Sequence, residues 1–526
     1  MNKFISCSLL ISLIFFFYID VFAAEYYLDA DNGNDDSGDG SSGNPWRTIE
    51  KAQQVMQSGD VFYLRNGNYN TFSENSASGR SDWITFQAES GHDPFVTGIY
   101  LLYDSQINSY LRFENIDVLV PYYRPTCDSI PSCVLPDGYC DPQCPDIGVG
   151  HYISVSDAIR IENARNVEFS HGNIIGSDKY LTGGGVGIYD SENILFFENE
   201  MTKVFRGVEF EGNKNIILEG NHIHEGVGSC IRLLPVNEGV TIERNHCHDF
   251  GYDFSDDYCP RGSGNNPHGS ALSIRTGDIV ISNNIFHDGF NSAGVMFYEL
   301  DSGQPEDTHY SNVLFENNIV YDVVNTYAFR AYRLGDNITF RNNLLVGHYR
   351  TNDQGDITPD GRYRYQTAFQ IHSFADGFDG SGFSMYNNIV IGIASMGESN
   401  PISEDNNIIW SYLSGDWQCS PPRGQNTKII TCSYSNHDNY FENDFFQENI
   451  NFYQGHENTY AFEYDILSEA YNFGDSNNQP GDSLGTLDPD GFILDNGNMR
   501  DSSHHSAGPY EFSGADSESC VGQCTN

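Results

Sequence analysis

The middle of the chain repeats a short pattern in which apolar and polar residues alternate before an Asn. Seven segments superimpose when the sequence is cut after this Asn: ILFFENEM, IILEGNHI, VTIERNHC, IVISNNIF, VLFENNIV, ITFRNNLL and FSMYNNIV. Alternation with a period of two is typical of β-strands, and the repeat shows no sustained helical periodicity. The pattern therefore predicts stacked coils of short strands. The shared position is occupied by Asn199, Asn221, Asn245, Asn284, Asn318, Asn343 and Asn388.

The repeated Asn is interpreted as a structural residue. Stacking brings equivalent positions of neighbouring coils to about 4.8 Å from each other, so these side chains form a column. An Asn in a tight turn tolerates the left-handed backbone conformation and hydrogen-bonds to nearby backbone groups. The intervals between the Asn residues are unequal. The shortest intervals correspond to a bare coil, and the longer ones carry loops.

Rings and carboxylates recur just beyond the Asn turns. His–Asp neighbours suggest catalysis, but a catalytic site does not repeat in every coil. A stacked column of rings beside turn-capping carboxylates is therefore the favoured interpretation. The rings are His224, His248, His287 and Tyr321, and the carboxylates are Glu225, Asp249, Asp288 and Asp322.

A second strand precedes each Asn turn: AIRIEN, GVGIYD, GVEFEG, CIRLLP, ALSIRT, GVMFYE, AFRAYR and AFQIHS. The second and fourth residues are apolar or small and are expected to face the core, whereas the third and fifth face outward. The first outward column is Arg160, Gly187, Glu209, Arg232, Ser273, Met296, Arg330 and Gln370, and the second is Glu162, Tyr189, Glu211, Leu234, Arg275, Tyr298, Tyr332 and His372.

Two segments near the ends of the chain also resemble known proteins. The stretch YYLDADNGNDDSGDGSSGNPWRTIEKAQQVMQSGDVFYLRNGNY contains a loop rich in Gly, Asp and Ser, a short helix at residues 46 to about 57, and a strand ending in Gly-x-Tyr. SAGPYEF lies near the other end. Over residues 25–512 the chain resembles the right-handed parallel β-helix superfamily, which includes pectate lyases, chondroitinase-like and alginate lyases, and alginate epimerases. The resemblance implies an all-β, single-stranded parallel β-helix (a solenoid) with an N-terminal capping helix.

The first residues have the order of a secretory signal, with one Lys, an apolar run and then small residues. We expect a secreted protein, with the periplasm or the cell surface as alternatives, and no membrane segment after cleavage. The expected organisation is a signal peptide at 1–23, a β-helix domain at 24–512 and a tail at 513–526. Within the domain we expect a cap and first coils at 24–120, a Cys-rich loop at 121–150, regular coils at 151–410 and irregular closing coils at 411–512.

The charge balance limits the partners. With 26 Lys and Arg against 73 Asp and Glu, the net charge is −47, which argues against nucleic acid or an anionic membrane as the main partner. An anionic substrate would need a locally basic strip on this acidic surface. We expect a monomer.

Cysteines are dense in two segments of the chain. In an exported protein this density predicts local disulfides, with a zinc site as the rival interpretation. The mature chain keeps an odd number after loss of Cys7, so one thiol stays free or pairs between molecules. The dense segments hold Cys127, Cys133, Cys140 and Cys144, and then Cys520 and Cys524.

The outward columns form the predicted functional strip. Guanidinium groups bind carboxylates or sulfates through paired hydrogen bonds, and tyrosine rings pack on sugars. The alternative is a salt-bridged ladder in which glutamates neutralise the arginines. Insertions at residues 250–267, 300–311 and 349–365 are expected to enter just before strands of this face and to form a groove. The predicted catalytic residues are Arg232, Arg275, His268, His372 and Tyr298, and the predicted substrate-binding residues are Arg330, Tyr332, Tyr189, Glu209, Glu211 and Gln370.

The expected activity is that of an extracellular polysaccharide lyase, which cleaves an anionic glycan by β-elimination. The strip supplies cations for the substrate carboxylate and groups that transfer protons. Glu209 and Glu211 are also compatible with the two carboxylates of a glycoside hydrolase. A uronate epimerase and a non-catalytic glycan-binding or adhesion protein stay open. Calcium is the expected metal, since acidic loops offer oxygen ligands; one such loop contains Asp29, Asp31, Asp35, Asp36 and Asp39.

Overall fold

The computed structural model describes most of the repeat and its N-terminal end. The described residues are 23–76, 80–120, 157–176, 184–226, 228–251, 269–287, 289–298, 310–321, 323–325, 327–347, 367–371, 382–391, 393–396, 403–412, 428–432, 450–455, 459–464, 486–487, 493–495 and 511–512. Residues 1–22 of the signal peptide predicted at 1–23, the Cys-rich segment at 121–150 and the tail at 513–526 lie outside them.

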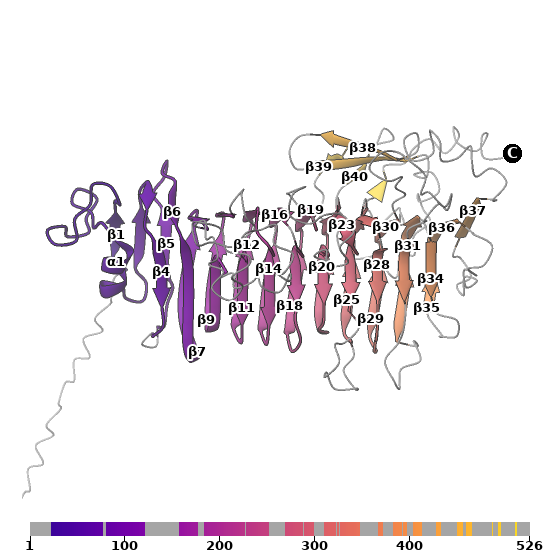
Figure 1. Ribbon diagram of the computed structural model, residues 1–526, viewed down its shortest axis with the longest axis horizontal. Helices are drawn as coiled ribbons and strands as arrows, with labels where there is room; N and C mark the ends of the chain where they lie inside the picture. Colours follow the sequence, from indigo (N-terminus) through magenta and orange to yellow (C-terminus); the bar gives the residue numbers. More distant parts are fainter. Residues whose placement is uncertain are drawn as a thin grey trace, which may run out of the picture.

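The described strands stack into an elongated body (Figure 1). Their pairings between coils follow three rows, here named the first, second and third faces. All pairings between coils are parallel. The first face contains β4 (Thr71–Glu74), the first parts of β7 (Gly98–Glu114) and β9 (Ile159–Ser170), β11 (Val186–Tyr189), β14 (Val208–Glu211), β17 (Ile231–Leu233), β20 (Leu272–Ile274), β24 (Val295–Phe297), β28 (Tyr327–Ala331), β31 (Thr367–Ile371) and β34 (Ile393–Met396).

The second face contains the strands that lead into the Asn turns, and β7 and β9 extend onto it from the first face. Its other strands are β1 (Glu25–Leu28), β2 (Val61–Leu64), β5 (Ile84–Ala88), β12 (Glu192–Phe197), β15 (Lys214–Glu219), β18 (Glu238–Glu243), β21 (Ile279–Ser282), β25 (Val313–Glu316), β29 (Ile338–Arg341), β32 (Phe383–Tyr386) and β35 (Ser403–Asp405).

The third face follows the Asn turns. It contains β3 (Gly67–Asn68), β6 (Pro94–Val96), β8 (Asp117–Leu119), β10 (Asn173–Ile175), β13 (Glu200–Thr202), β16 (His222–Gly226), β19 (His246–Phe250), β22 (Ile285–Phe286), β26 (Ile319–Val320), β30 (Leu344–Val346), β33 (Ile389–Ile391), β36 (Ile408–Tyr412) and β37 (Lys428–Cys432), with β23 (Gly289–Ser292) and β27 (Val323–Asn325) beside this row.

Strands later in the chain leave the parallel stack. β38 (Ile450–Gly455) pairs antiparallel with β39 (Thr459–Tyr464). β40 (Thr486–Leu487) pairs antiparallel with β41 (Ile493–Asp495) and parallel with β42 (Glu511–Phe512). Regular parallel stacking is therefore seen as far as β37, and the predicted domain boundaries stay predictions.

Columns of apolar side chains fill the interior of the coils. Phe315 and Phe340, one coil apart, are both fully buried and their rings stack with centroids 4.9 Å apart. Phe329 and Phe369 stack in the same way at 5.2 Å. Burial of each such side chain stabilises the fold by roughly 1.5–3 kcal/mol relative to its exposure. The inward positions predicted from the alternating pattern therefore form the core.

The Asn ladder is confirmed, and it continues to Asn407. The Oδ1 atom of Asn318 accepts hydrogen bonds from the backbone N–H and the side-chain amide of Asn284, both at 3.0 Å. The prediction about the left-handed conformation was wrong by one residue, because this conformation falls on the residue before each ladder Asn. Arg244 and Asn317, for example, have φ of 55° and 56°. This offset directs the ladder side chain into the stack.

A helix, α1 (Ile49–Val55), lies within the range predicted for a capping helix. The Thr48 hydroxyl accepts a hydrogen bond from the Lys51 backbone N–H at its start, and Ile49 and Ala52 are buried. Its role as a cap stays a prediction. Among the described residues, no helix is both long enough and apolar enough to cross a membrane.

Candidate functional site

The first face carries the predicted outward columns in the predicted register. Arg160 pairs with Gly187, Gly187 with Glu209, Glu209 with Arg232, and Arg232 with Ser273. The series continues through Met296 and Arg330 to Gln370. Because coils repeat about every 4.8 Å, the column from Arg160 to Gln370 extends for about 34 Å. The first column is therefore confirmed from end to end.

The second column runs beside the first. Tyr189 pairs with Glu162 on one side and with Glu211 on the other. Backbone hydrogen bonds between coils continue this row, from the Arg275 N–H to the Leu233 carbonyl and from the Tyr298 N–H to the Ile274 carbonyl. The Tyr332 N–H makes the next such bond. His268 and His372 lie outside the described residues.

The N-terminal part of the strip is a network of opposite charges, here named the Asp157 cluster: Asp157, Arg160, Tyr189, Arg206, Glu209 and Arg232. The Glu209 carboxylate binds Arg206 Nη1 at 2.7 Å and Arg232 Nη1 at 2.8 Å, and it accepts the Tyr189 hydroxyl at 3.1 Å. The alternative interpretation of a salt-bridged ladder is therefore correct for Glu209 and Arg232. The exposed Glu211 on the same strand takes no part in it.

Asp157 is a partly buried carboxyl within this cluster. Its Oδ2 lies 3.2 Å from Arg160 Nη1. Burial raises the pKa of Asp157 to about 6, an effect that Arg160 opposes and Glu209 reinforces. Burial also raises the pKa of Tyr189, helped by Asp157 and Glu209, so its hydroxyl stays protonated. The cluster thus holds a carboxyl that titrates near neutral pH beside a phenolic proton donor.

The absence of a side chain at Gly187 leaves space for the Asp157 carboxyl group beside the strip. A Cβ atom at this position would lie 2.4 Å from Asp157 Oδ2 and 2.8 Å from the ring of Tyr189. The missing side chain leaves room for the carboxyl group, which comes from the start of the preceding coil. A side chain at residue 187 would displace the acid.

The C-terminal part of the strip is a cationic and aromatic surface, here named the Arg330 platform: Arg275, Tyr298, Tyr327, Arg330 and Tyr332. The Arg330 guanidinium carbon lies 4.3 Å from the ring centroid of Tyr327 and 4.5 Å from that of Tyr332. Arg275 lies over Tyr298 at 5.2 Å. These distances are in the range of cation–π interactions. Stacking therefore holds the guanidinium groups in fixed orientations.

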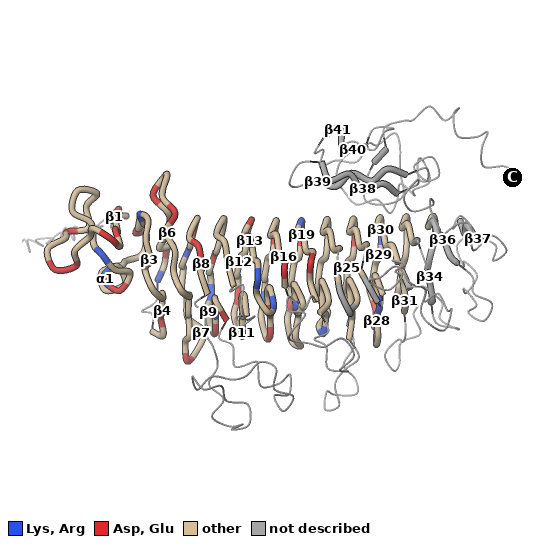
Figure 2. Tube along the Cα trace, turned by 45° about the horizontal axis from the view of Figure 1, so that its top comes forward, with Lys and Arg blue, Asp and Glu red and all other residues tan. Residues whose placement is uncertain are grey.

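Arg330 differs from Arg232 in its partners. No carboxylate within the described part of the chain forms an ion pair with Arg330, and its Nε atom is buried there without a hydrogen-bond partner. The Oε1 atom of Gln370, the next residue in the column, is likewise without a partner among the described residues. Figure 2 marks the positions of both charge signs along the coils. The cationic end of the strip is thus the Arg330 platform.

The insertions only partly follow the prediction. Those at residues 250–267 and 349–365 precede β20 and β31 of the first face, as expected. The insertion at 300–311 instead follows β24 and precedes β25 of the second face, so that prediction was wrong. Most residues of these insertions lie outside the described ranges.

The acidic N-terminal loop uses its carboxylates within the loop itself. Asp29 Oδ1 accepts the backbone N–H of Asn32 at 2.8 Å, and Asp35 Oδ2 accepts the Thr48 hydroxyl at 2.7 Å. A turn accounts for the Asp29 carboxylate, and contacts with the start of α1 account for that of Asp35, without a metal. The expected calcium ion stays a prediction.

Comparisons with known proteins agree with this architecture. The family described as "Right handed beta helix region" matches residues 157–358. The chain is a right-handed parallel β-helix. No curated protein sequence matches it.

Solved structures similar to this β-helix include "Rhamnogalacturonan lyase", at 14% identity and a TM-score of 0.36, over 73% of this chain and 87% of that one. "The complex structure of XylC with xylose" aligns at 12% identity and a TM-score of 0.43, over 92% and 98%. "Crystal structure of pectate lyase Pel9A" aligns at 12% identity and 0.32, over 77% and 82%.

The sequence did not reveal Asp157, Arg206 or Tyr327 as site residues. Asp157 and Arg206 precede their strands, outside the aligned segments, and Tyr327 lies one position before AFRAYR. Their only sequence signal is their position just before the strands of the strip. The Cys230–Cys247 disulfide was also missed.

Proposed function

We propose that this β-helix binds an anionic polysaccharide along its first face and cleaves it as a lyase. The observation that carries the proposal is the Arg330 guanidinium, stacked between Tyr327 and Tyr332 and without a carboxylate partner among the described residues. On a chain with a net charge of −47, such a cation fits an acidic ligand better than it fits a purely structural role.

The platform matches the chemistry of a uronate chain. Guanidinium groups bind carboxylates through two parallel hydrogen bonds, while tyrosine rings offer flat surfaces to sugar rings. Arg275 and Arg330 stand on strands two coils apart, so their backbones are separated by about 10 Å along the stack. An extended acidic glycan that lies along the stack would meet both cations.

The Asp157 cluster offers groups for β-elimination. In this proposal a cation of the cluster, Arg160 or Arg232, neutralises the uronate carboxylate, and the Asp157 carboxylate takes the proton from the adjacent carbon, C5. The electron pair forms the C4–C5 double bond as the C4–O bond breaks, and the Tyr189 hydroxyl protonates the departing oxygen. The raised pKa of Asp157 makes it a stronger base than an ordinary carboxylate.

Glycoside hydrolysis is the second candidate, because the same cluster holds two carboxyls in different environments. Asp157 is partly buried and has a raised pKa, whereas Glu209 is bound by two arginines. Pairs of this kind divide the roles of acid and ionised partner in hydrolases. In that reaction the protonated form of Asp157 would be the active one.

Incubation of the purified protein with pectate, alginate, a glycosaminoglycan and a sulfated algal polymer tests these proposals. Rising ultraviolet absorbance from an unsaturated uronate identifies a lyase, and new reducing ends without it identify a hydrolase. Parallel incubations with EDTA test the calcium prediction. If no polymer is cleaved, the enzyme proposal is wrong, and retained glycan binding would leave a binding protein.

Variants locate the reaction. Arg330→Ala is expected to weaken substrate binding, and Asp157→Asn to abolish turnover with little effect on binding. Arg112→Ala is the matched control, because Arg112 also lies over an aromatic ring, that of Trp83 at 4.9 Å, but on the second face. Full activity of Asp157→Asn would move the chemical step elsewhere.

A further inference from the structure

Five histidines gather on the third face, away from the proposed polysaccharide site. His222 and His224 lie on β16, and His246 and His248 on β19. The parallel register pairs His222 with His246 and His224 with His248. Residues two apart on a strand share a face, so both pairs point outward, while Ile223 and Cys247 between them are buried. His287 follows in the next coil, beside His248.

The predicted ring column is confirmed and accounts for part of this arrangement. His224 stacks on His248 with centroids 5.2 Å apart, and His248 stacks on His287 at 5.0 Å. Tyr321 extends the stack at 4.7 Å from His287. Stacking therefore explains one column, whose last member is a tyrosine that needs no imidazole chemistry.

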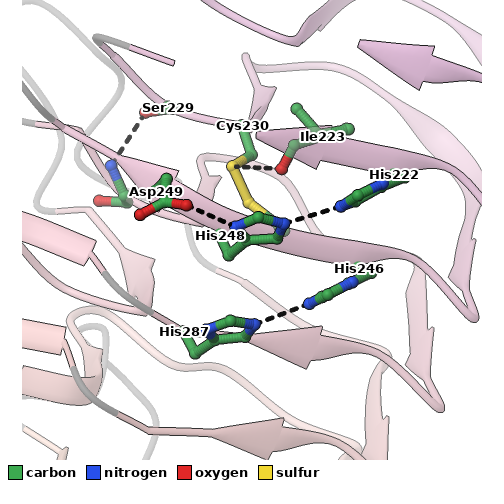
Figure 3. Close-up of a disulfide and its surroundings, with 10 residues drawn as sticks. His222, Ile223, Ser229, Cys230, His246, His248, Asp249 and His287 are labelled. Atoms are coloured by element: carbon green, nitrogen blue, oxygen red, sulfur yellow. Dashed lines mark hydrogen bonds and ion pairs between the residues drawn. A yellow bond between two sulfur atoms is a disulfide. The ribbon is translucent and has the colours of Figure 1, made fainter. Parts of the chain in front are cut away.

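A second column, which the sequence did not reveal, meets the first through its ring nitrogens. His222 Nε2 lies 2.7 Å from His248 Nε2, and His246 Nε2 lies 2.7 Å from His287 Nε2 (Figure 3). His222 and His246 stack on each other at 4.9 Å. In this metal-free structure each contact is a hydrogen bond in which one imidazole donates and the other accepts, and it brings ring nitrogens of the two columns together.

The donor atoms have the proximity of a metal site. One donor atom each from His222, His246 and His248 lie within 4.8 Å of one another. Tetrahedral Zn²⁺ bound to nitrogen at about 2.0–2.1 Å places its ligand atoms roughly 3.3 Å apart. Binding of one ion by these three rings would replace the His222–His248 hydrogen bond and would turn His246 Nε2 away from His287.

Asp249 prepares His248 to act as a ligand. Its Oδ2 lies 2.8 Å from His248 Nδ1 (Figure 3). A carboxylate that accepts the Nδ1 proton leaves a lone pair on Nε2, which is the arrangement usual around zinc-bound histidines. In this structure that lone pair faces His222 Nε2, and a metal ion would replace this hydrogen bond.

The backbone beneath the cluster is covalently held. Cys247 lies between His246 and His248, faces the core and forms a disulfide with Cys230 (Figure 3). This bond ties β19 to the residue just before β17. The spacing of the imidazole-bearing strands is therefore set by both the sheet and the disulfide.

We propose that His222, His246 and His248 bind one divalent transition-metal ion, with Asp249 as a positioning residue. The donor set of imidazoles without thiolates fits Zn²⁺, Cu²⁺ or Ni²⁺ and does not fit Ca²⁺, which prefers oxygen ligands. This site is independent of the proposed lyase activity, because it lies on another face.

Calorimetric titration of the EDTA-treated and dialysed full-length protein with Zn²⁺ tests the proposal. We expect one Zn²⁺ per chain in the wild type and no binding at this site in the triple variant His222→Gln, His246→Gln, His248→Gln. Asp249→Asn is expected to weaken binding about 10- to 100-fold. His171→Gln is the matched control, since His171 also contacts a carboxylate, that of Glu198 at 3.1 Å, but stands outside the cluster.

Absence of Zn²⁺ binding by the wild type, or unchanged binding by the triple variant, would overturn the proposal. A second measurement uses the wild type alone, so that its result does not depend on the folding of the triple variant. Zn²⁺ is expected to protect the peptides that carry His222, His246 and His248 from modification by diethyl pyrocarbonate, and equal modification with and without Zn²⁺ would also overturn it.

Discussion

The Arg330 guanidinium contacts two tyrosine rings and no carboxylate among the described residues. We therefore expect that a lysine at this position cannot replace arginine in binding an acidic ligand. Arg330→Lys keeps the charge but loses the planar fork and the stacking between Tyr327 and Tyr332. Loss of a charged hydrogen bond costs about 1.5–3 kcal/mol, so we expect the lysine variant to bind an acidic oligosaccharide roughly 10- to 100-fold more weakly. Calorimetry measures this affinity, and wild-type affinity in Arg330→Lys would show that charge alone is sufficient.

Asp157 makes a prediction about stability and pH. Its folded-state pKa of about 6 lies above the ordinary value of 3.8, so between these values the folded protein binds more protons than the unfolded chain. The free energy of unfolding therefore falls as the pH rises through this window, by roughly 3 kcal/mol for this group. Asp157→Asn removes that dependence.

Denaturant unfolding at pH 4 and pH 7 provides the measurement. Relative to Asp157→Asn, the wild type should lose stability between the two values. Equal pH dependence in the two proteins would contradict the raised pKa. In activity assays the same group distinguishes the reactions, because a lyase base gains activity as the pH rises through about 6 and a hydrolase acid loses it.

At the residue scale, the alternating pattern predicted which side chains share a column but not what those side chains contact. Glu209 and Arg232 were correctly placed as neighbours. The position of Asp157 depends on the empty space at Gly187 in the next coil, which is a property of packing between coils. The alternation of apolar and polar residues along one strand does not predict the space between coils.

The turns are the elements that the sequence predicted best. Asn318 is fully buried, and its Nδ2 donates to the Ile281 carbonyl at 2.9 Å while its Oδ1 accepts from Asn284. Asn318→Ala leaves buried backbone groups without partners, at about 1–3 kcal/mol for each group. We expect a loss of about 2–5 kcal/mol in the free energy of unfolding.

Urea unfolding followed by circular dichroism measures this loss. Asn44→Ala is the control, because Asn44 is an exposed residue outside the ladder whose side chain donates to the Ser37 carbonyl. A comparable loss in both variants would show that the ladder contributes no more to stability than an exposed hydrogen bond.

The recurrence of Asn in the sequence predicted where the ladder lies. The left-handed residue before each ladder Asn varies among Glu, Gly, Arg and Asn, so the sequence did not predict its position.

The third face shows a second limit at the element scale. The ring column of His224, His248 and His287 follows from the repeat, because its members occupy one register position. The contacts of that column with His222 and His246 depend on ring orientations, which are set by packing. The Cys230–Cys247 disulfide similarly joins positions from two faces of the coil, and no periodicity predicts such a pairing.

At the scale of the whole molecule, a strongly negative net charge coexists with a locally basic strip on the first face. The chain carries a net charge of −47, yet its stacked coils gather arginines on one face. Part of this basic strip is neutralised at Glu209, and the Arg330 platform keeps its cation available among the described residues. In the proposed function, recognition of an acidic glycan is therefore a local property of a few coils, opposed by long-range repulsion.

The most direct test of this account measures binding of one oligouronate in two forms, with its carboxylates intact and with them reduced to alcohols. The account predicts that the wild type binds the acidic form at least about 10-fold more tightly than the reduced form, a ratio that one charged hydrogen bond supplies. Arg330→Ala should lose this preference, whereas Arg112→Ala should keep it. Equal binding of the two forms by the wild type, or an unchanged preference in Arg330→Ala, would contradict the assignment of the Arg330 platform as the site for an acidic polysaccharide.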